Sequence, residues 1–270
     1  MLMANRTVAE AFYWLDVPFI YRIHEKPSAD KIANFNSFLA NMNMRIKGSE
    51  PHPMEFARML AEIRGTEREM LISKVMLRSL MKAKYSDSNE GHFGLAFRYY
   101  CHFTSPIRRY PDLAIHRIIK EYINGGLDAD RAQHYAKFVT AAAKKSSEAE
   151  INAMQAEREV EDMKKAEYME QHIGEIYPAV ISGVTEFGLF VELPNTVEGL
   201  IKTEDLPNDY YIYDVNTLSL IGRRPKNKFT LGDKLTVKVL KASKETSMVD
   251  FIICKEEKRG KKCEQRKKEK

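Results

Sequence analysis

The sequence predicts an α+β protein in two parts, a mostly helical part over residues 1–171 and a small five-stranded β-barrel over residues 172–254. Through most of the first part, apolar residues recur at helical spacing. At Ile173 the pattern changes to a period of two, punctuated by glycines such as Gly183 and Gly188. The chain has 270 residues, a length that suits about two domains.

Residues 255–270 are predicted to form a basic, disordered tail. Nine Lys and Arg stand there against four Glu, so this segment alone carries +5, the net charge of the whole chain. Overall, 44% of the residues are hydrophobic and 30% are charged, which excludes a wholly disordered protein. No apolar run is long enough for a membrane span or a signal peptide, so we expect a cytoplasmic protein.

The first part is expected to contain several helices and one extended stretch. In chain order these are a helix-like segment over Thr7–Trp14, an extended stretch over Pro18–Pro27, a helix starting at Ser28, helices over Met54–Ile63 and Glu67–Lys84, a helix from Pro111 to Gly125, and a helix over Asp130–Lys145. Between them, residues 92–110 lack a helical period and are predicted to be a strand entering a loop. Ser147 and Glu150 form a capping-box pattern, which predicts a new, long, charged helix to about Gln171.

The second part alternates apolar and polar residues in short runs. Strands are predicted around Val180–Ser182 and Phe190–Glu192, and over Lys234–Leu240 and Val249–Ile253. Five short strands in about 80 residues suit a small closed barrel.

The segment Thr104–Asp112 is the densest polar motif of the helical part. Arg108 and Arg109 are adjacent and directly precede a predicted helix N-terminus, where free N–H groups favour an anion. Because the planar guanidinium can hold phosphate oxygens bidentately, the functional interpretation is a phosphate-bearing ligand. The alternative is that the two arginines pair with Asp112 or with another carboxylate.

The barrel carries a second candidate site. Phe187 and Phe190 flank Gly188, and rings on an open barrel face can stack on unpaired bases. Several basic residues follow between Tyr210 and Lys244, among them Arg223 and Arg224. Aromatic rings with interleaved cations are what single-stranded nucleic acid requires. The alternative for either Phe is core packing, and Phe190 could face either way.

The carboxylates give no sign of a metal site. Two-metal phosphodiester chemistry needs several carboxylates close together, whereas the Asp residues of this chain are scattered. Glu157 belongs to an acidic group on the predicted long helix, which an exposed charged face also explains.

Several long motifs, in the same order, resemble the ribonuclease II/ribonuclease R family. The resemblance in the helical part lies in Pro18–Pro27, His92–Ala96, His102–Arg117 and Ala156–Glu167, and that in the barrel lies in Gly199–Ile201, Asn208–Asp214, Ser219–Gly222 and Leu231–Asp233. The first set is similar to the C-terminal part of the RNB nuclease domain. The second set is similar to an S1 domain, an OB-fold that binds RNA, and the tail resembles that of ribonuclease R.

The resemblance implies a hydrolytic 3′→5′ exoribonuclease that releases nucleoside 5′-monophosphates with two Mg²⁺ ions. By motif, Arg108 corresponds to the arginine that contacts the phosphate at the scissile end, and Glu157 matches an acidic residue beside the active site. Arg109 and Tyr110 belong to the same motif as Arg108. Lys202 stands where S1 domains often place a histidine, which retains an ionic contact and removes a stacking surface.

The family's metal-binding aspartate motif has no match in this chain, so we expect its Mg²⁺ ligands to lie elsewhere. Two hypotheses follow. In the first, the chain is the C-terminal part of a ribonuclease R-like enzyme, inactive alone and dependent on the missing N-terminal half as a partner. In the second, it is a stand-alone S1-type protein that binds single-stranded RNA without nuclease activity.

Overall fold

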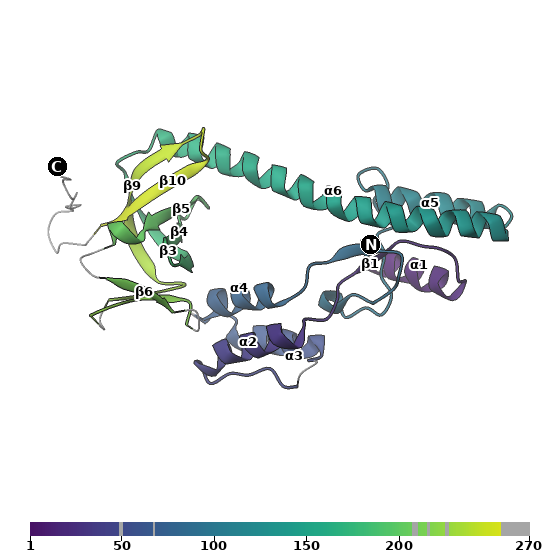
Figure 1. Cartoon of the computed structure of the whole chain (residues 1–270), viewed down its shortest axis with the longest axis horizontal. Coiled ribbons are helices and arrows are strands. Elements are labelled where there is room, and N and C mark those ends of the chain that lie inside the picture. The colour runs from purple at the N-terminus through teal and green to yellow at the C-terminus, as the bar shows by residue number, and fades with distance from the viewer. Residues whose placement is uncertain (49–50, 67, 207–209, 215–216, 225–226, 255–270) are drawn as a thin grey trace. The chain divides into compact units, whose positions relative to one another are not determined.

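The computed structural model describes residues 1–48, 51–66, 68–206, 210–214, 217–224 and 227–254 (Figure 1). Its α-helices are α1 (Leu2–Trp14), α2 (Ala29–Ala40), α3 (Pro53–Ile63), α4 (Glu69–Ser79), α5 (Tyr110–Ile123) and α6 (Ala129–Glu170). The predicted basic tail lies outside the described residues. Within the part that the structure describes, no helix is both long enough and apolar enough to cross a bilayer.

The chain divides into two compact units. Unit 1 comprises residues 1–36, 44–64 and 74–154, and unit 2 comprises residues 37–43, 65–73 and those described from 155 onward. Unit 1 holds most of the helices together with the strands β1 (Tyr21–Ile23) and β2 (Lys84–Ser86) and the 3₁₀ turn η1 (Phe93–Leu95). Unit 2 holds the barrel.

The core of unit 1 joins α1, β1, α5 and part of α6. Phe19, Ile23, Ile115 and Ile118 are almost completely buried in it. Ile115 and Ile118 are three residues apart, so they lie on the same face of α5. Burying a side chain of this size contributes about 1.5–3 kcal/mol, and this face therefore anchors the helix whose first turn carries the arginine motif.

The helix predicted over Glu67–Lys84 is shorter in the structure. It ends at Ser79, whose hydroxyl donates to the carbonyl of Met76 at 2.7 Å. After a short irregular stretch, Lys84–Ser86 form β2, which pairs antiparallel with β1. Tertiary pairing of the backbone thus overrides the local helical spacing.

The strand predicted within residues 92–110 is wrong. This segment forms η1 and a loop, with isolated bridges from His92 to His24 and Phe97. The backbone N–H of Phe93 donates to the carbonyl of His24 at 2.8 Å, and that of Ala96 donates back to Phe93 at 3.0 Å. Short-range turns and single bridges therefore satisfy the backbone groups that a strand would have paired.

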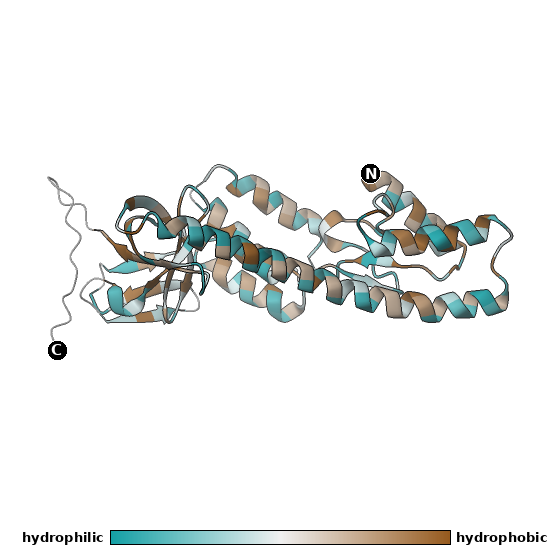
Figure 2. Ribbon diagram, turned by 90° about the horizontal axis from the view of Figure 1, so that it is seen from above, coloured by the Kyte–Doolittle hydropathy of each residue, from teal (hydrophilic) through white to brown (hydrophobic). Residues whose placement is uncertain are grey.

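The two helices predicted around Ser147 are one continuous helix, α6, and the capping box is not formed. The Ser147 hydroxyl donates to the carbonyl of Ala143, four residues earlier, at 3.0 Å. It also accepts the backbone N–H of Tyr85 at 2.9 Å. A hydroxyl engaged in this way has no free helix N–H to cap. Figure 2 shows hydrophilic and hydrophobic residues mixed along α6.

The predicted α+β class and the closed five-stranded barrel are confirmed. The barrel strands are β3 (Ile176–Thr185), β4 (Gly188–Glu192), β5 (Glu198–Lys202), β9 (Lys234–Ser243) and β10 (Met248–Ile253), in the closed order β10-β5-β4-β3-β9. Alternation places Leu189 and Val191 in the core and leaves Phe190 on the outer surface. This arrangement is consistent with an OB-fold.

Two details of the barrel were not predicted. At Gly188, an added Cβ would lie 2.2 Å from the carbonyl oxygen of Ile201, so only glycine allows β4 and β5 to approach this closely. In addition, a three-stranded sheet of β6 (Tyr211–Asp214), β7 (Ser219–Gly222) and β8 (Lys228–Thr230) is inserted between β5 and β9. Tyr211 and Leu220 of this sheet contribute to the core of unit 2.

Candidate functional site

The arginine loop, residues 104–110, is fixed by one buried carboxylate. Asp112, in the first turn of α5, has no exposed surface. Its Oδ1 accepts the backbone N–H of Ser105 at 2.8 Å and Arg109 Nη2 at 2.7 Å, and its Oδ2 accepts Arg109 Nε at 2.9 Å. Of the two predicted interpretations, pairing with a carboxylate therefore holds for Arg109. It contacts Asp112 through two parallel hydrogen bonds, the bidentate geometry that fixes an arginine most firmly.

Arg108 remains exposed beside this pair. Within the described residues its guanidinium forms no ion pair, and the preceding Ile107 is fully exposed. Tyr110, at the start of α5, is 49% exposed. The loop thus presents one guanidinium and one phenol at a helix N-terminus, an arrangement suited to an anionic ligand.

A polar network in unit 1 supports the segment that leads into this loop. Arg22 Nη1 lies 2.6 Å from Glu150 Oε2, and its guanidinium carbon lies 4.6 Å from the ring centroid of Tyr85. The Tyr85 hydroxyl is 2.9 Å from His102 Nδ1. Burial, with the neighbouring cations Arg109 and Arg22, lowers the pKa of His102 to about 4, so this ring is neutral at pH 7.

The other histidines of the motif are also held by the fold. His116 Nε2 lies 2.9 Å from the carbonyl of Phe103, and the two rings stack at 4.3 Å between centroids. The pKa of His92 is lowered to about 4, chiefly by burial and then by His24 and Arg22. His116 is therefore held in place by the fold, and the neutral His92 ring is held through Nδ1, which accepts the backbone N–H of Leu95 at 3.2 Å.

Glu157 lies on an exposed stretch of α6. It belongs to unit 2, whereas Arg108 and Arg109 belong to unit 1. The neighbouring Gln155 donates to Glu159 at 2.9 Å, as expected for a solvated helix face.

The barrel presents an aromatic surface, which we call the barrel platform and define by Phe187, Phe190, Leu200, Lys202 and Asp250. Phe187 is 60% exposed in the turn between β3 and β4, and its ring meets that of Phe190 edge-on at 5.9 Å. Phe190, Leu200 and Asp250 occupy paired positions on β4, β5 and β10. Lys202 Nζ lies 3.4 Å from Asp250 Oδ2. Rings, a cation and a carboxylate therefore share one outer face.

Asp250 and Leu200 of this platform were not among the residues predicted from the sequence. Alternation along β10 gives the signal for Asp250, because its neighbours Val249 and Phe251 are buried. The register that places it beside Lys202 involves β5 and β10, which are distant in sequence. Alternation along one strand does not specify that pairing.

Arg223 and Arg224 are exposed in the loop after β7, not on a barrel strand. The backbone N–H of Arg223 donates to the carbonyl of Tyr210 at 3.1 Å. On the same sheet, Ile212 and Ile221 are directly paired and Ile212 is 62% exposed. The basic segment predicted for one barrel face is therefore divided between this inserted sheet and β9.

The described residues do not fit a magnesium site. They contain no group of three or more His, Cys, Asp or Glu side chains placed to hold a metal ion. Asp112, the fully buried carboxylate of the arginine loop, already has two protein partners.

Comparisons with known proteins match both units. A model described as the RNB domain matches residues 1–125, and one described as the S1 RNA binding domain matches residues 170–253. Ribonuclease R 1 of Lactococcus lactis is 46% identical over 253 residues, which cover 93% of this chain and 31% of that protein. Ribonuclease R of Thermotoga maritima is 40% identical and is covered to 37%. The chain thus spans about a third of these relatives.

Solved structures give the same result. The apo form of Mycoplasma genitalium RNase R superposes with a TM-score of 0.86 at 27% identity, covering 94% of this chain and 40% of that one. The same enzyme in complex with ribose-methylated single-stranded RNA gives a TM-score of 0.85 at 28% identity, with the same coverage.

Proposed function

Because this chain belongs to the ribonuclease II/ribonuclease R family, with part of an RNB domain followed by an S1 domain, we propose that it binds single-stranded RNA. The observation that carries the proposal is the barrel platform. Two rings lie beside Lys202 on one outer face, which supplies stacking surfaces for bases and a cation for phosphate. We expect this binding to occur in the cytoplasm.

The finer proposal is that the chain is the RNA-holding part of a 3′→5′ exoribonuclease that releases nucleoside 5′-monophosphates. Arg108 would contact the phosphate at the scissile end. Its exposure beside the fixed Arg109–Asp112 pair supports this role. Glu157 would lie by the reacting phosphate, with Arg109 positioning the loop and Tyr110 contacting RNA.

Hydrolysis in this family depends on Mg²⁺, which would neutralise phosphate charge and activate water. Since the described residues do not fit that ion, we propose that a polypeptide carrying the acidic part of the RNB domain is the partner that completes the activity. A stand-alone RNA-binding protein is the second candidate function, and the exposed platform supports it equally.

Fluorescence anisotropy with a labelled single-stranded RNA tests the binding proposal. Phe187→Ala is expected to weaken affinity by about tenfold, because stacking on one ring contributes about 1–3 kcal/mol per base. Tyr168→Ala is the matched control, since Tyr168 is 52% exposed on α6 and is not part of the platform. Equal affinities for the wild type and the Phe187 variant would refute the platform.

A 3′-labelled RNA with Mg²⁺ separates the two candidate functions. The chain alone is expected to leave the RNA intact in both cases. Shortening that appears only when the acidic RNB polypeptide is added, and that is lost in Arg108→Ala, would support the exoribonuclease. No shortening with the added polypeptide would leave the RNA-binding function, and shortening by the chain alone would contradict the proposed need for a partner.

A further inference from the structure

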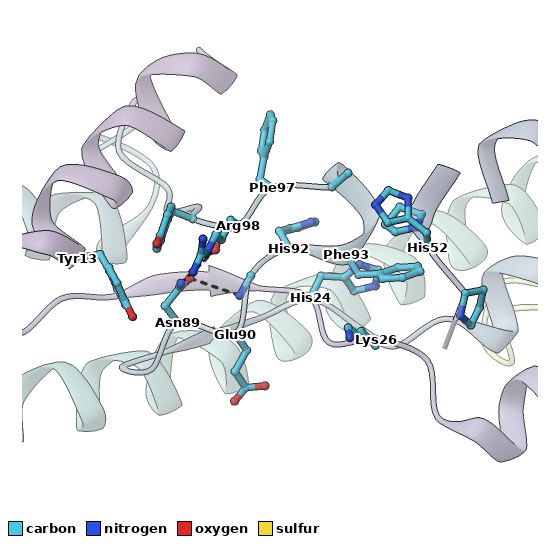
Figure 3. Close-up of a pocket in the computed structure, with 15 residues that line it drawn as sticks. Tyr13, His24, Lys26, His52, Asn89, Glu90, His92, Phe93, Phe97 and Arg98 are labelled. Carbon is cyan, nitrogen blue, oxygen red and sulfur yellow. Dashed lines mark hydrogen bonds between the residues drawn. The ribbon is translucent and has the colours of Figure 1, made fainter. Parts of the chain in front are cut away.

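Unit 1 contains a cavity of about 540 Å³ that belongs neither to the arginine loop nor to the barrel platform. Its wall is formed by the ends of α1 and β1, the start of α3 and the segment from Asn89 to Tyr99 (Figure 3). Its volume lies within the range of about 300–1,000 Å³ that is typical of small-molecule sites.

The floor of the cavity is rigid. His24 Nδ1 accepts the backbone N–H of Gly94 at 2.8 Å, and His24 Nε2 lies 2.6 Å from the carbonyl of Met81. The backbone N–H of His24 donates to Gly91 at 3.0 Å. A Cβ at position 94 would lie 3.0 Å from His24 Nδ1, so the chain is already packed closely there. The cavity is therefore preformed.

The wall combines positive charge with aromatic rings. Lys26 and Arg98 provide cations, Glu90 provides a carboxylate, and Phe97 and Tyr13 provide rings. Arg98 is exposed and forms no ion pair within the described residues. In Figure 3 the Glu90 side chain extends to the side opposite Phe97. An anion carrying a planar ring would therefore find complementary groups.

One polar group of the wall, the His92 ring, has a nitrogen that can still form a hydrogen bond. His92 Nδ1 accepts the backbone N–H of Leu95 at 3.2 Å, so the neutral ring carries its proton on Nε2, for which the described residues provide no acceptor.

We propose that this cavity binds a nucleoside 5′-phosphate, either as a free nucleotide or as one residue of an RNA strand. Arg98 and Lys26 hold the phosphate, Phe97 and Tyr13 contact the base, and His92 Nε2 donates to the ligand. The RNA alternative depends on the proposed RNA-binding function, whereas the free nucleotide alternative does not.

The single tryptophan of the chain reports on this cavity. Trp14 lies edge-on to Tyr13 at 5.4 Å and to Tyr99 at 6.2 Å between ring centroids, and both tyrosines line the wall. Titration of the full chain with adenosine 5′-monophosphate is therefore expected to change Trp14 fluorescence saturably. Adenosine without phosphate is expected to bind more weakly.

Two variants assign the response to the cavity. Arg98→Ala is expected to weaken the apparent affinity by about tenfold, the usual effect of losing a hydrogen bond to a charged group. Phe97→Leu is expected to weaken it by a few fold, since it removes the ring and retains an apolar side chain. Arg45→Ala, an exposed arginine of unit 1 outside the wall, is the matched control. An affinity that neither cavity variant changes would overturn the proposal.

A short single-stranded RNA oligonucleotide distinguishes the two sources. Saturation of Trp14 by adenosine 5′-monophosphate identifies a free nucleotide site. If only the oligonucleotide saturates the response and Arg98→Ala weakens it, the cavity holds a nucleotide of a strand. No response to either probe would refute the site. The Phe187→Ala anisotropy experiment is independent of Trp14, so failure of the platform and failure of the cavity are separable.

Discussion

The arginine loop of unit 1 is held by charge, whereas the barrel platform of unit 2 is held by apolar packing. In the loop, a fully buried carboxylate fixes Arg109 and the backbone of Ser105. On the barrel, Leu189 and Val191 are buried on either side of Phe190 and set its direction. The arginine loop should therefore lose its structure when the single Asp112 carboxylate is removed. The barrel platform should instead depend on how closely neighbouring strands of the barrel approach each other.

The largest effect is expected for Asp112→Ala. Removing one partner of a buried pair leaves an uncompensated charge and costs about 3–5 kcal/mol, and the N–H of Ser105 also loses its acceptor. Urea unfolding followed by Trp14 fluorescence reports on unit 1, where the only tryptophan lies.

The control for this variant is Asp130→Ala, which removes an exposed carboxylate from the first turn of α6. It is expected to cost at most about 1 kcal/mol through the helix dipole. If Asp112→Ala cost no more than this control, the arginine loop would not be held by charge.

Gly188→Ala is expected to have the next largest effect, in unit 2. The new Cβ would lie 2.2 Å from the carbonyl oxygen of Ile201, so β4 and β5 must move apart. Overpacking of this kind costs about 1–3 kcal/mol. Amide hydrogen exchange of β4 and β5 measures the loss, while the Trp14 transition is expected to stay in place.

Gly174→Ala is the matched control, because the nearest heavy atom to its added Cβ is 4.0 Å away, at the flexible end of Lys238. Because Gly174 has a positive φ, alanine at this position strains the backbone but does not clash with a neighbouring strand. Hydrogen exchange at β4 and β5 that is as fast in Gly174→Ala as in Gly188→Ala would show that the close approach of the two strands is not what holds the platform.

Lowering the pH is expected to have a smaller effect, a decrease in the free energy of unfolding of unit 1 through the histidines of its polar network. The pKa of His102 and that of His92 are lowered to about 4 in the folded state, whereas an unfolded histidine titrates near 6.5. Between these values the unfolded chain binds more protons, so the free energy of unfolding falls as the pH is lowered from about 6.5 to about 4.

Comparing His102→Gln with wild type by urea unfolding at several pH values measures this contribution. The variant is expected to lose part of the pH slope, and His134→Gln, which replaces an exposed histidine of α6, is expected to retain all of it. An unchanged slope in His102→Gln would mean that the ring is not held neutral by the fold.

The same difference between the two sites explains what could be predicted from the sequence. Period-two alternation follows from apolar packing on one face of a strand, so the barrel could be predicted, whereas the sequence left open whether Phe187 and Phe190 pack in its core. The Arg109–Asp112 pair joins residues three apart, and pairing of this kind was one of the two interpretations drawn from the sequence. The burial of Asp112 decides between pairing and ligand binding for Arg109, and the spacing of residues in the sequence does not show burial.

Long-range pairing accounts for the parts that could not be predicted. Ser147 carries a capping-box pattern, yet its hydroxyl meets the backbone of Tyr85, 62 residues away in sequence. Asp250 meets Lys202 only through the register of β5 with β10. The sheet of β6, β7 and β8 consists of very short strands, which weaken the alternation signal.

The smallest predicted effect concerns Lys202, which forms an ion pair with Asp250 on the barrel platform, a surface otherwise held by apolar packing. Lys202→Ala leaves the Asp250 carboxylate without its lysine partner and, if the platform binds RNA as proposed, removes one phosphate contact. The RNA affinity is expected to fall by a few fold, and the slope of log affinity against log salt to decrease by about 1. The matched control is Lys234→Ala, which replaces an exposed lysine at the start of β9.

Adding Asp250→Asn to Lys202→Ala should recover part of the affinity, because it removes the repulsion between the Asp250 carboxylate and the RNA phosphates. If the double variant bound no better than Lys202→Ala, the platform would act through its rings and Lys202 alone, with no contribution from Asp250.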